Sequence, residues 1–283
     1  GTDPAAWLAA AEADEVDCFY ENVGEYVDVM EGIGWENSEI ATGSTILIRP
    51  NQTTPDADGN TVYADKRVRQ ALAMAVDNNI CLELGYANKG APADNHHAGS
   101  MHPEHDPSVG RLPYDPAKAK ALMAEAGMAD YEHELISIDD DWRKNTTDAV
   151  AAQLRDAGIK VKRTILPGST FWNDWAKYPF SSTNWNHRPF AVQVWGLAYR
   201  SGEAWNEMGW NNAEFDALLA EANSIADADK RRAVAGKCQA LIAEEGCTIQ
   251  PYWRSLYRSH SSNTVCDMHI AYHAHVYKWG FKA

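Results

Sequence analysis

The sequence predicts an α/β fold, a mixed sheet flanked by helices, and a strand–helix–strand unit is its clearest sign. H-E-L-I-S-I (residues 133–138) has the apolar, β-branched character of a strand, and residues 144–157 have helical apolar spacing. I-K-V-K-R-T-I-L from Ile159 then alternates as a strand does. Two strands joined through a helix lie parallel in one sheet. Helical spacing in several other segments supplies the layers that cover this sheet.

The elements before this unit are predicted mainly from caps and turn residues. Residues 3–14 begin with Asp-Pro and are rich in Ala, which is typical of a helix start. V-D-C-F-Y (residues 16–20) and S-T-I-L-I-R-P-N (residues 44–51) predict two strands. Residues 51–63 are polar and turn-rich, so they predict a connection.

The central part is expected to hold two helices separated by a long loop. Asp65 caps the first helix, whose apolar spacing continues to Ile80. The Gly/Pro/His-rich segment 85–113 has no periodicity, and loops of that length are usually functional or disordered. Asp115 then starts a compact helix that Gly127 ends.

After the strand–helix–strand unit, strands and helices continue to alternate. F-A-V-Q-V-W from Phe190 predicts a strand, and residues 213–225 and 228–244 predict two helices. C-T-I-Q-P-Y-W (residues 247–253) and residues 259–265 are strand-like. The aromatic, His-rich tail that follows is compatible with either element.

Composition excludes several classes of function. The chain has 283 residues and a formal net charge of −15, which argues against binding to nucleic acid and against attraction to an anionic membrane surface. No apolar run approaches the roughly 20 residues of a membrane span, and no signal peptide is visible at the start. The abundance of Trp (11) and Tyr (12) against Phe (6) suggests a binding surface, because Trp and Tyr combine apolar area with a polar group.

Neither the cysteines nor any catalytic motif indicates an enzyme. The five cysteines are too few for a disulfide scaffold and contain no C-x-x-C, although Cys238 and Cys247 flank a helix end and could meet. The motifs G-x-S-x-G, H-E-x-x-H, G-x-x-x-x-G-K-[ST] and G-x-G-x-x-G are all missing. We therefore expect a protein that is not an enzyme, has no catalytic residues and needs no cofactor. The acidic run Asp139–Asp141 is interpreted as a solvated loop.

Several short segments follow one another in a fixed order over nearly the whole chain. They are A-A-W-L-A-A-A-E-A-D-E-V-D, D-K-R-V-R-Q-A-L-A-M-A-V-D, Y-D-P-A-K-A-K-A-L-M-A-E-A-G, A-A-Q-L-R-D-A-G-I-K-V, W-N-E-M-G-W-N-N-A-E-F-D-A-L-L-A-E-A and D-A-D-K-R-R-A-V. In this order and spacing they resemble the extracellular solute-binding proteins of ABC importers of the peptide/opine/nickel-binding type, family 5. Members of that family are roughly twice as long and have two lobes joined by crossing strands.

The resemblance implies a lobe of the periplasmic-binding-protein type II kind. It suggests that the chain corresponds to the carboxyl-terminal half of a family member. Residues 1–55 are then expected to be a remnant of lobe one with a crossover strand, residues 56–252 to form lobe two, and residues 253–283 to return toward lobe one. The crossover would run through Ile46–Thr54 and Gln250–Leu256. In the family, hinge closure encloses the ligand between the lobes.

The resemblance also implies a function and partners. It predicts a periplasmic or extracellular substrate-binding component that captures an oligopeptide or related small solute and delivers it to a membrane permease. A direct insertion of this chain into the membrane is not expected. The ligand stays open among peptides, opines, sugar-like molecules and metal complexes.

The segment W-N-H-R-P-F-A-V-Q-V-W-G-L-A-Y-R-S-G-E-A-W-N is the main candidate for a ligand site. It combines aromatic side chains with a few polar groups, as ligand pockets do, and a guanidinium can hold a carboxylate through two hydrogen bonds. The alternative is that Val194 and Trp195 are core and that Arg188 forms a surface ion pair. The ligand-binding candidates are Trp185, Arg188, Trp195, Tyr199, Trp205 and Asn206.

One departure from the family pattern affects the expected ligand. Peptide-binding members generally carry an Asp just after the Gly-Trp region of this segment, where it pairs with the peptide's ammonium group. Here Ala198 and Tyr199 occupy that place, and nothing in the sequence shows that Glu203 replaces the acid.

Two His-rich segments provide the remaining candidates. His96 and His97 are predicted to contact ligand from the long loop, whose further His102, His105 and acidic neighbours suit Zn or Ni chemically. A metal-binding solute-binding protein, or a metal-dependent hydrolase using residues 96–105, is therefore the alternative function. The spacing fits no standard zinc site, so a polar loop near the mouth of the cleft is expected and no metal ligand is assigned. His269, His273 and His275 form a similar cluster in the tail.

Overall fold

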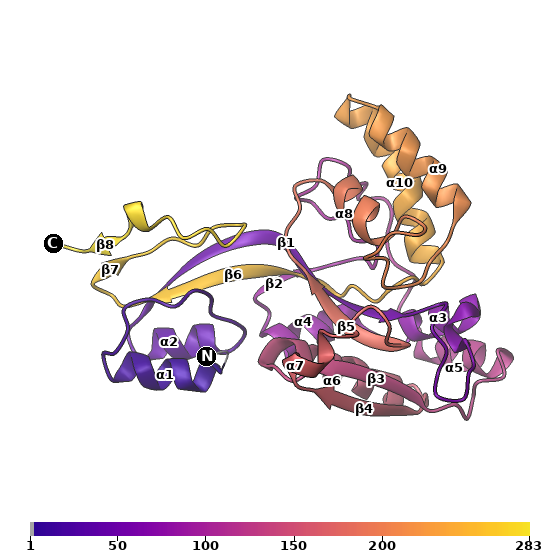
Figure 1. The fold of residues 1–283 in the computed structure, drawn as a ribbon, viewed down its shortest axis with the longest axis horizontal. Helices are drawn as coiled ribbons and strands as arrows, with labels where there is room; N and C mark the ends of the chain where they lie inside the picture. Colours follow the sequence, from indigo (N-terminus) through magenta and orange to yellow (C-terminus); the bar gives the residue numbers. More distant parts are fainter. Residues whose placement is uncertain (1–2) are drawn as a thin grey trace.

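The computed structural model describes residues 3–283, and a six-stranded mixed sheet runs through most of the molecule (Figure 1). The strand order is β2-β6-β1-β5-β3-β4. β3 pairs in parallel with β4 and β5, whereas β1, β2, β5 and β6 pair antiparallel. The strands are β1 Glu36–Pro50, β2 Gly90–Pro92, β3 His133–Ile138, β4 Val161–Leu166, β5 Phe180–Trp185 and β6 Tyr252–His260.

The predicted strand–helix–strand unit is confirmed as β3, α6 (Asp141–Asp156) and β4. Val150 and Leu154 of α6 are fully buried against the sheet, as the spacing predicted. The helix begins three residues earlier than expected, because the Asp140 side chain accepts a hydrogen bond from the Arg143 backbone N–H at 3.1 Å and caps the first turn. The prediction of a solvated acidic loop here is therefore wrong for Asp140.

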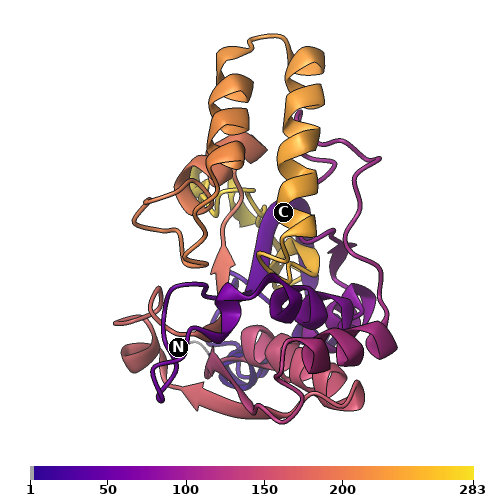
Figure 2. The same cartoon turned by 90° about the vertical axis from the view of Figure 1, so that its right-hand side faces the viewer.

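Most other predicted helices are present, with one division. The helix predicted from Asp65 to Ile80 is two helices, α3 (Lys66–Met74) and α4 (Asn78–Tyr86), because Asp77 caps a second helix through the Asn79 N–H. The remaining helices of the central and carboxyl-terminal parts lie close to the expected bounds, and α9 and α10 form the long projecting hairpin of Figure 2. They are α5 Pro116–Glu125, α9 Ala213–Ser224 and α10 Ala228–Glu244.

The strand predicted from Phe190 is wrong, because this segment forms helix α8, Ala191–Ala198. Its buried residues are Ala191, Val194, Trp195 and Ala198, a spacing of three, four and seven residues that belongs to one helix face. The strand of this region lies earlier, at β5, where Ser181 to Thr183 are buried although polar. The short helix α7 (Gly168–Phe171) and the 3-10 turn η1 (Val62–Ala64) were also not predicted.

The two ends of the chain pack together beside the main body, and we call residues 3–35 and 261–283 the terminal layer (Figure 1). The strand predicted at residues 16–20 is reduced to a single bridge between Cys18 and His260. The layer contains α1 Pro4–Glu12, α2 Tyr26–Gly32, β7 Thr264–Val265, η2 Val276–Lys278 and β8 Gly280–Phe281.

An antiparallel ribbon of β1 and β6 joins the terminal layer to residues 56–252, which we call the main lobe. β1 begins at Glu36, eight residues before the expected start, and pairs with β6 from Glu36↔His260 to Thr45↔Trp253. The register shifts between Ala41 and Ser44, which is a β-bulge. The ribbon therefore bends where it enters the main lobe.

The five cysteines are all free thiols, so Cys238 and Cys247 do not form the disulfide that their spacing allowed. Among the helices of residues 3–283, none has the length and apolar character needed to cross a bilayer.

Candidate functional site: a cleft between the terminal layer and the main lobe

A continuous cleft separates the terminal layer from the main lobe. It consists of three adjoining pockets of about 490, 250 and 220 Å³. The first and second share Trp142 and Arg143, the first and third share Trp172, and the second and third share Asn184 and Asn186. Cavities of this total size accommodate small organic ligands and short peptides.

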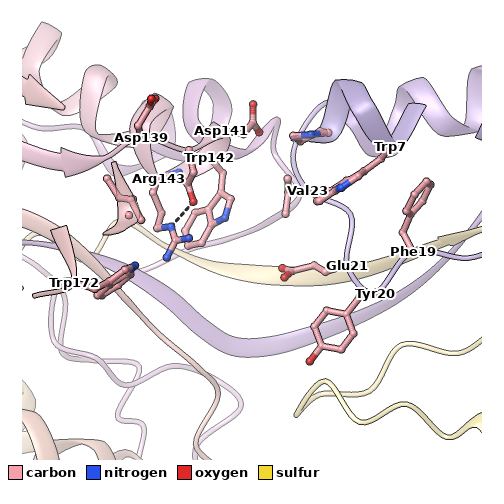
Figure 3. A pocket seen from close by; sticks show the side chains of 14 residues that line it. Trp7, Phe19, Tyr20, Glu21, Val23, Asp139, Asp141, Trp142, Arg143 and Trp172 are labelled. Carbon is pink, nitrogen blue, oxygen red and sulfur yellow. Dashed lines mark hydrogen bonds and ion pairs between the residues drawn. The ribbon is translucent and has the colours of Figure 1, made fainter. Parts of the chain in front are cut away.

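The terminal layer contributes aromatic side chains and one acid to the cleft. Residues 19–22 run along the edge of β6, where the Phe19 and Asn22 backbone N–H groups donate to Ser259 and Tyr257 carbonyls at 2.9 and 2.8 Å. Trp7 of α1 stacks on Phe19 with ring centroids 5.8 Å apart. Figure 3 shows Glu21 and Tyr20 on this side of the pocket, across from Trp142 and Arg143.

The main lobe contributes the segment that follows β3 and starts α6. Trp142 and Arg143 lie there, at the carboxyl end of a parallel strand. Arg143 donates to Asn184 Oδ1 at 2.6 Å and lies 5.6 Å above the Trp172 ring, so its guanidinium is held between β5 and α7. These contacts fix a cation at the centre of the cleft.

Arg254 of β6 connects the two walls. Its guanidinium carbon lies 3.9 Å from the Trp142 ring centroid, Nη1 donates to Glu21 at 2.9 Å, and Nη2 donates to the Tyr272 hydroxyl at 2.8 Å. The side chain is only 2% exposed, so its charge needs these partners. Its buried Nε has no hydrogen-bond partner in residues 3–283.

Asp141 supplies a carboxylate whose charge is only partly compensated. Desolvation by burial, followed by the neighbouring Glu25 and Asp140, raises the pKa of Asp141 to about 6. Asp141 lines the largest of the three pockets. A cationic ligand group in this pocket would favour the ionised form.

Three of the predicted ligand-binding residues meet in the 220 Å³ pocket: Trp185, Arg188 and Trp205. The Trp185 and Trp205 rings are 5.7 Å apart at 67°, an edge-to-face arrangement. Arg188 Nη1 donates to the backbone carbonyls of Asn186 and His187 at 3.2 Å. The alternative is correct for Val194 and Trp195, which are 1% and 0% exposed and belong to the core, but no ion pair to Arg188 is found in the described chain.

Three other predicted residues lie outside the cleft. Trp195 and Tyr199 have no exposed surface and belong to the core beneath α9 and α10. Trp195 Nε1 donates to the His96 carbonyl at 3.1 Å. Asn206 donates to the Trp210 carbonyl at 2.8 Å and thereby fixes a turn. The assumption of a strand placed Trp195 and Tyr199 with Arg188, whereas helix α8 and its carboxyl-terminal cap turn these two side chains inward.

The His-rich loop is packed into the main lobe and does not form a polar loop at the cleft mouth. His96 and His97 are buried, and Tyr199 Oη lies 3.1 Å from His97 Nδ1. Burial lowers the pKa of His102 to about 4 and that of His97 well below its usual value. Neutral imidazoles with partners inside the fold stabilise this loop.

Asp94, His96 and His105 nevertheless bring one ligand atom each within 4.8 Å of the others. His96 Nε2 lies 3.1 Å from the Val109 carbonyl, and its Nδ1 accepts the Ala98 N–H at 3.3 Å. Since both ring nitrogens are engaged, a metal would displace a hydrogen bond of the fold. The metal-dependent alternatives gain no support from this loop.

The sequence interpretation missed Trp142, Arg143, Trp172 and Arg254 as cleft residues. A usable signal existed for the first two, because ligands of α/β sheets bind beyond the carboxyl ends of parallel strands, and W-R follows the end of β3 after the acidic run Asp139–Asp141. Arg254 and its partner Glu21 are 233 residues apart in the sequence, so only the folded chain shows their contact.

An α/β main lobe, a two-stranded ribbon and a second layer with a cleft between them define a type II periplasmic-binding-protein fold. Solved structures share it. The oligopeptide-binding protein AppA from Bacillus subtilis, in complex with a nonapeptide, superposes with a TM-score of 0.85 at 20% identity, over 100% of this chain and 59% of that one. NikZ from Campylobacter jejuni, in complex with Ni(L-His), gives 0.85 at 17% identity, over 99% of this chain and 60% of that one.

Sequence comparison gives the family. Residues 1–206 match the profile described as bacterial extracellular solute-binding proteins, family 5 Middle, and the chain belongs to this family.

Curated proteins also match this chain over part of their length. Heme-binding protein A of Haemophilus influenzae is 27% identical over 64% of this chain and 35% of its own length. The probable peptide ABC transporter periplasmic-binding protein y4tO of Sinorhizobium fredii is 26% identical over 84% of this chain and 47% of its own length. The chain thus spans less than half the length of these relatives.

Proposed function

We propose that this chain is the substrate-binding part of an ABC importer and that it binds an oligopeptide or a related small solute in the cleft. Residues 1–55 and 253–283 would belong to or lead into lobe one, and residues 56–252 would form lobe two. The protein would act in the periplasm or outside the cell and pass its ligand to a membrane permease. Family membership and the peptide-binding names among the relatives support this proposal.

The observation that carries the proposal is the composition of the cleft. Trp142, Trp172, Trp185 and Trp205 provide apolar and stacking surface, with Arg143 fixed among them. Aromatic walls with a few oriented polar groups are typical of small-molecule sites. No group of reacting residues is needed for such capture, so the proposed function is binding without catalysis.

The charged groups suggest how a peptide would lie in the cleft. Arg188 has backbone partners only, so its guanidinium is available for a ligand carboxylate. Asp141, with its raised pKa, is available for an ammonium group. Asp141 would then take the role of the acid that is absent at Ala198 and Tyr199.

Calorimetric titration of the chain, and of a longer natural form that includes a complete lobe one, with di- to pentapeptides tests the proposal. We expect R188A to weaken binding about tenfold or more, since a charge-assisted hydrogen bond contributes about 1.5–3 kcal/mol. A carboxyl-amidated peptide should show the same loss with the unmodified protein and no further loss with R188A.

The matched control is R200A, because Arg200 is paired with Glu203 and lines none of the three cleft pockets. R200A should bind peptide as the unmodified protein does. Equal affinity of R188A and R200A would refute the role of Arg188. Failure of the longer form to bind any peptide would refute the proposed ligand class.

A further inference from the structure

Three histidines of the terminal layer converge outside the cleft. His269, His273 and His275 place one ring nitrogen each within 4.8 Å of the others. The His269 and His273 rings are parallel, with centroids 4.6 Å apart, and the His275 ring stands at 72° to His269 at 4.9 Å. These side chains are exposed or half-buried, so the cluster is open to solvent.

The backbone between the histidines forms the turn that brings them together. Tyr272 has a left-handed φ of 61°, and its N–H donates to the His269 carbonyl at 2.9 Å. The Ala271 N–H donates to His269 Nδ1 at 3.1 Å, which leaves Nε2 of this ring free. An L-residue in the left-handed region is strained, and here it closes the turn that gathers the imidazoles.

Apart from His269 Nδ1, the ring nitrogens of this cluster have no hydrogen bond among residues 3–283. His275 Nδ1 is buried and without a hydrogen bond in residues 3–283, and it lies 3.5 Å from Asp267 Oδ2. Trp279 Nε1 donates to the other oxygen of Asp267 at 2.6 Å and orients this carboxylate. The arrangement thus contains three imidazoles and one positioned acid, which resembles a metal shell with its outer carboxylate.

The cluster differs in this respect from Asp94, His96 and His105. There the buried His96 already uses both ring nitrogens, whereas in the tail His269 keeps one nitrogen free and no hydrogen bond to the ring nitrogens of His273 is found in the described chain. A cation in the tail would therefore replace water and no bond of the fold.

We propose that His269, His273 and His275 bind one divalent transition-metal cation, Zn²⁺ or Ni²⁺, at the surface of the terminal layer. Imidazole nitrogen suits these ions and does not suit Ca²⁺ or Mg²⁺, which take oxygen ligands. Zn–N bonds of about 2.0–2.1 Å place tetrahedral ligand atoms roughly 3.4 Å apart, so the solvent-accessible rings need only rotate closer. Asp267 balances part of the added charge.

The proposed metal site is connected to the cleft through Tyr272. Tyr272 lies between two of the ligands, and its hydroxyl contacts both Arg254 at 2.8 Å and Glu21 at 3.4 Å. A metal that closes the turn would hold Tyr272 against the cleft wall. This site is separate from the cleft, and its metal affinity does not depend on the proposed function.

The test is calorimetric titration with ZnCl₂ and NiCl₂ of protein prepared without a polyhistidine tag and stripped of metal with a chelator. We expect one ion per chain for the unmodified protein and for H105A, which alters the other His cluster. H273A, which changes an exposed ring, should bind at least tenfold more weakly. Visible absorption of the Co²⁺ form should show tetrahedral coordination that H273A loses.

Two results would overturn the proposal. One is equal metal affinity of H273A and the unmodified protein. The other is loss of binding in H105A with binding retained in H273A, which would move the site to the buried loop. Circular dichroism of each variant confirms that the fold is unchanged, and H275A provides a second variant if H273A does not fold.

Discussion

The main lobe and the terminal layer are stabilised in different ways. The two large clusters of buried apolar residues lie almost wholly in the sheet and helices between Ile46 and Tyr252, and Val23 is the single buried member from the terminal layer among the described residues. In the terminal layer Tyr277 and Phe281 are 78% and 70% exposed. The main lobe therefore has its own core, as an independent domain requires.

The terminal layer has a small set of buried apolar side chains, such as Val27 and Met30, and hydrogen bonds attach it to the ribbon. Asn22 Nδ2 donates to Ser259 Oγ at 2.7 Å, and Arg258 donates to the Tyr20 and Asp267 carbonyls at 3.1 and 2.6 Å. Such bonds contribute little net free energy each and depend on the position of β6. The main lobe is therefore the rigid wall of the cleft, whereas the position of the terminal layer, its other wall, depends on the ribbon.

The largest expected loss of stability comes from the buried ion pair between Arg49 of β1 and Glu207 of the main lobe. Arg49 Nε and Glu207 Oε2 are 3.2 Å apart with both side chains fully buried, and Thr183 donates to Glu207 at 2.6 Å. E207Q leaves the guanidinium uncompensated, so we expect a loss of about 3–5 kcal/mol in the free energy of unfolding, measured by urea denaturation. The matched change E36Q, at an exposed pair with Lys282, should leave stability nearly unchanged.

An equal change in the free energy of unfolding for E207Q and E36Q would contradict the stated difference between the two regions.

A second effect concerns the packing of helices. A Cβ on Gly85 of α4 would lie 2.1 Å from Thr146 Oγ1 and 2.8 Å from the Cα of the same residue in α6. We expect G85A to cost about 2–3 kcal/mol despite the better helix propensity of Ala, because the helices must separate. G32A, at the end of α2 in the terminal layer, meets no atom within 4 Å.

G32A should therefore be neutral or slightly stabilising in thermal denaturation. A smaller loss for G85A than for G32A would contradict the close packing of α4 on α6.

The smallest expected change in stability concerns Asp141, which lines the cleft between the two regions, and this change depends on pH. Since the pKa of Asp141 in the folded protein, about 6, is above the usual 3.8, the folded state binds this proton more tightly. The stabilisation from this proton is complete below about pH 4 and is lost as the pH rises through 6. D141N should therefore be more stable than the unmodified protein at pH 7.5, by about 1 kcal/mol after solvent screening, and equal at pH 4.

D148N on the same helix is the control, because the pKa of Asp148 is shifted in the opposite direction to that of Asp141. Burial raises the pKa of Asp148, but hydrogen bonds from Lys144 and Arg163 outweigh burial and lower it. D148N should thus be less stable than the unmodified protein at pH 7.5, and this difference should shrink as the pH falls. Urea denaturation of D141N and D148N at pH 4 and pH 7.5 measures both effects. A change of stability in the same direction for both variants at pH 7.5 would contradict the opposite pKa shifts of Asp141 and Asp148.

The sequence predicts elements well where apolar periodicity decides the structure and poorly where polar residues are buried. β3, α6 and β4 follow from periodicity alone, whereas β5 carries the buried polar run Ser181–Thr183 and gives no apolar signal. In α8 the letters V-Q-V-W alternate as in a strand, although the buried positions follow a helix. Local patterns cannot separate these cases when tertiary packing decides them.

The candidate site was only partly accessible from the sequence, for a related reason. Trp185, Arg188 and Trp205 lie within 21 consecutive residues, so a local cluster revealed them. Arg254 meets Glu21 and Tyr272 only after the ribbon pairs and the two chain ends come together. The aromatic excess indicated a binding surface, but its location required the topology of the sheet.

A change of angle at the β-bulge between Ala41 and Ser44 moves the far end of the ribbon relative to the main lobe. From the bulge to Glu36 the strand extends roughly 23 Å at about 3.3 Å per residue, so a rotation of about 10° at the bulge carries its far end about 4 Å. The Gly43 N–H donates to His187 Nδ1 at 2.8 Å, and a Cβ on Gly43 would lie 2.9 Å from that nitrogen. The bend in the ribbon therefore lies next to Arg188, which lines the 220 Å³ pocket of the cleft.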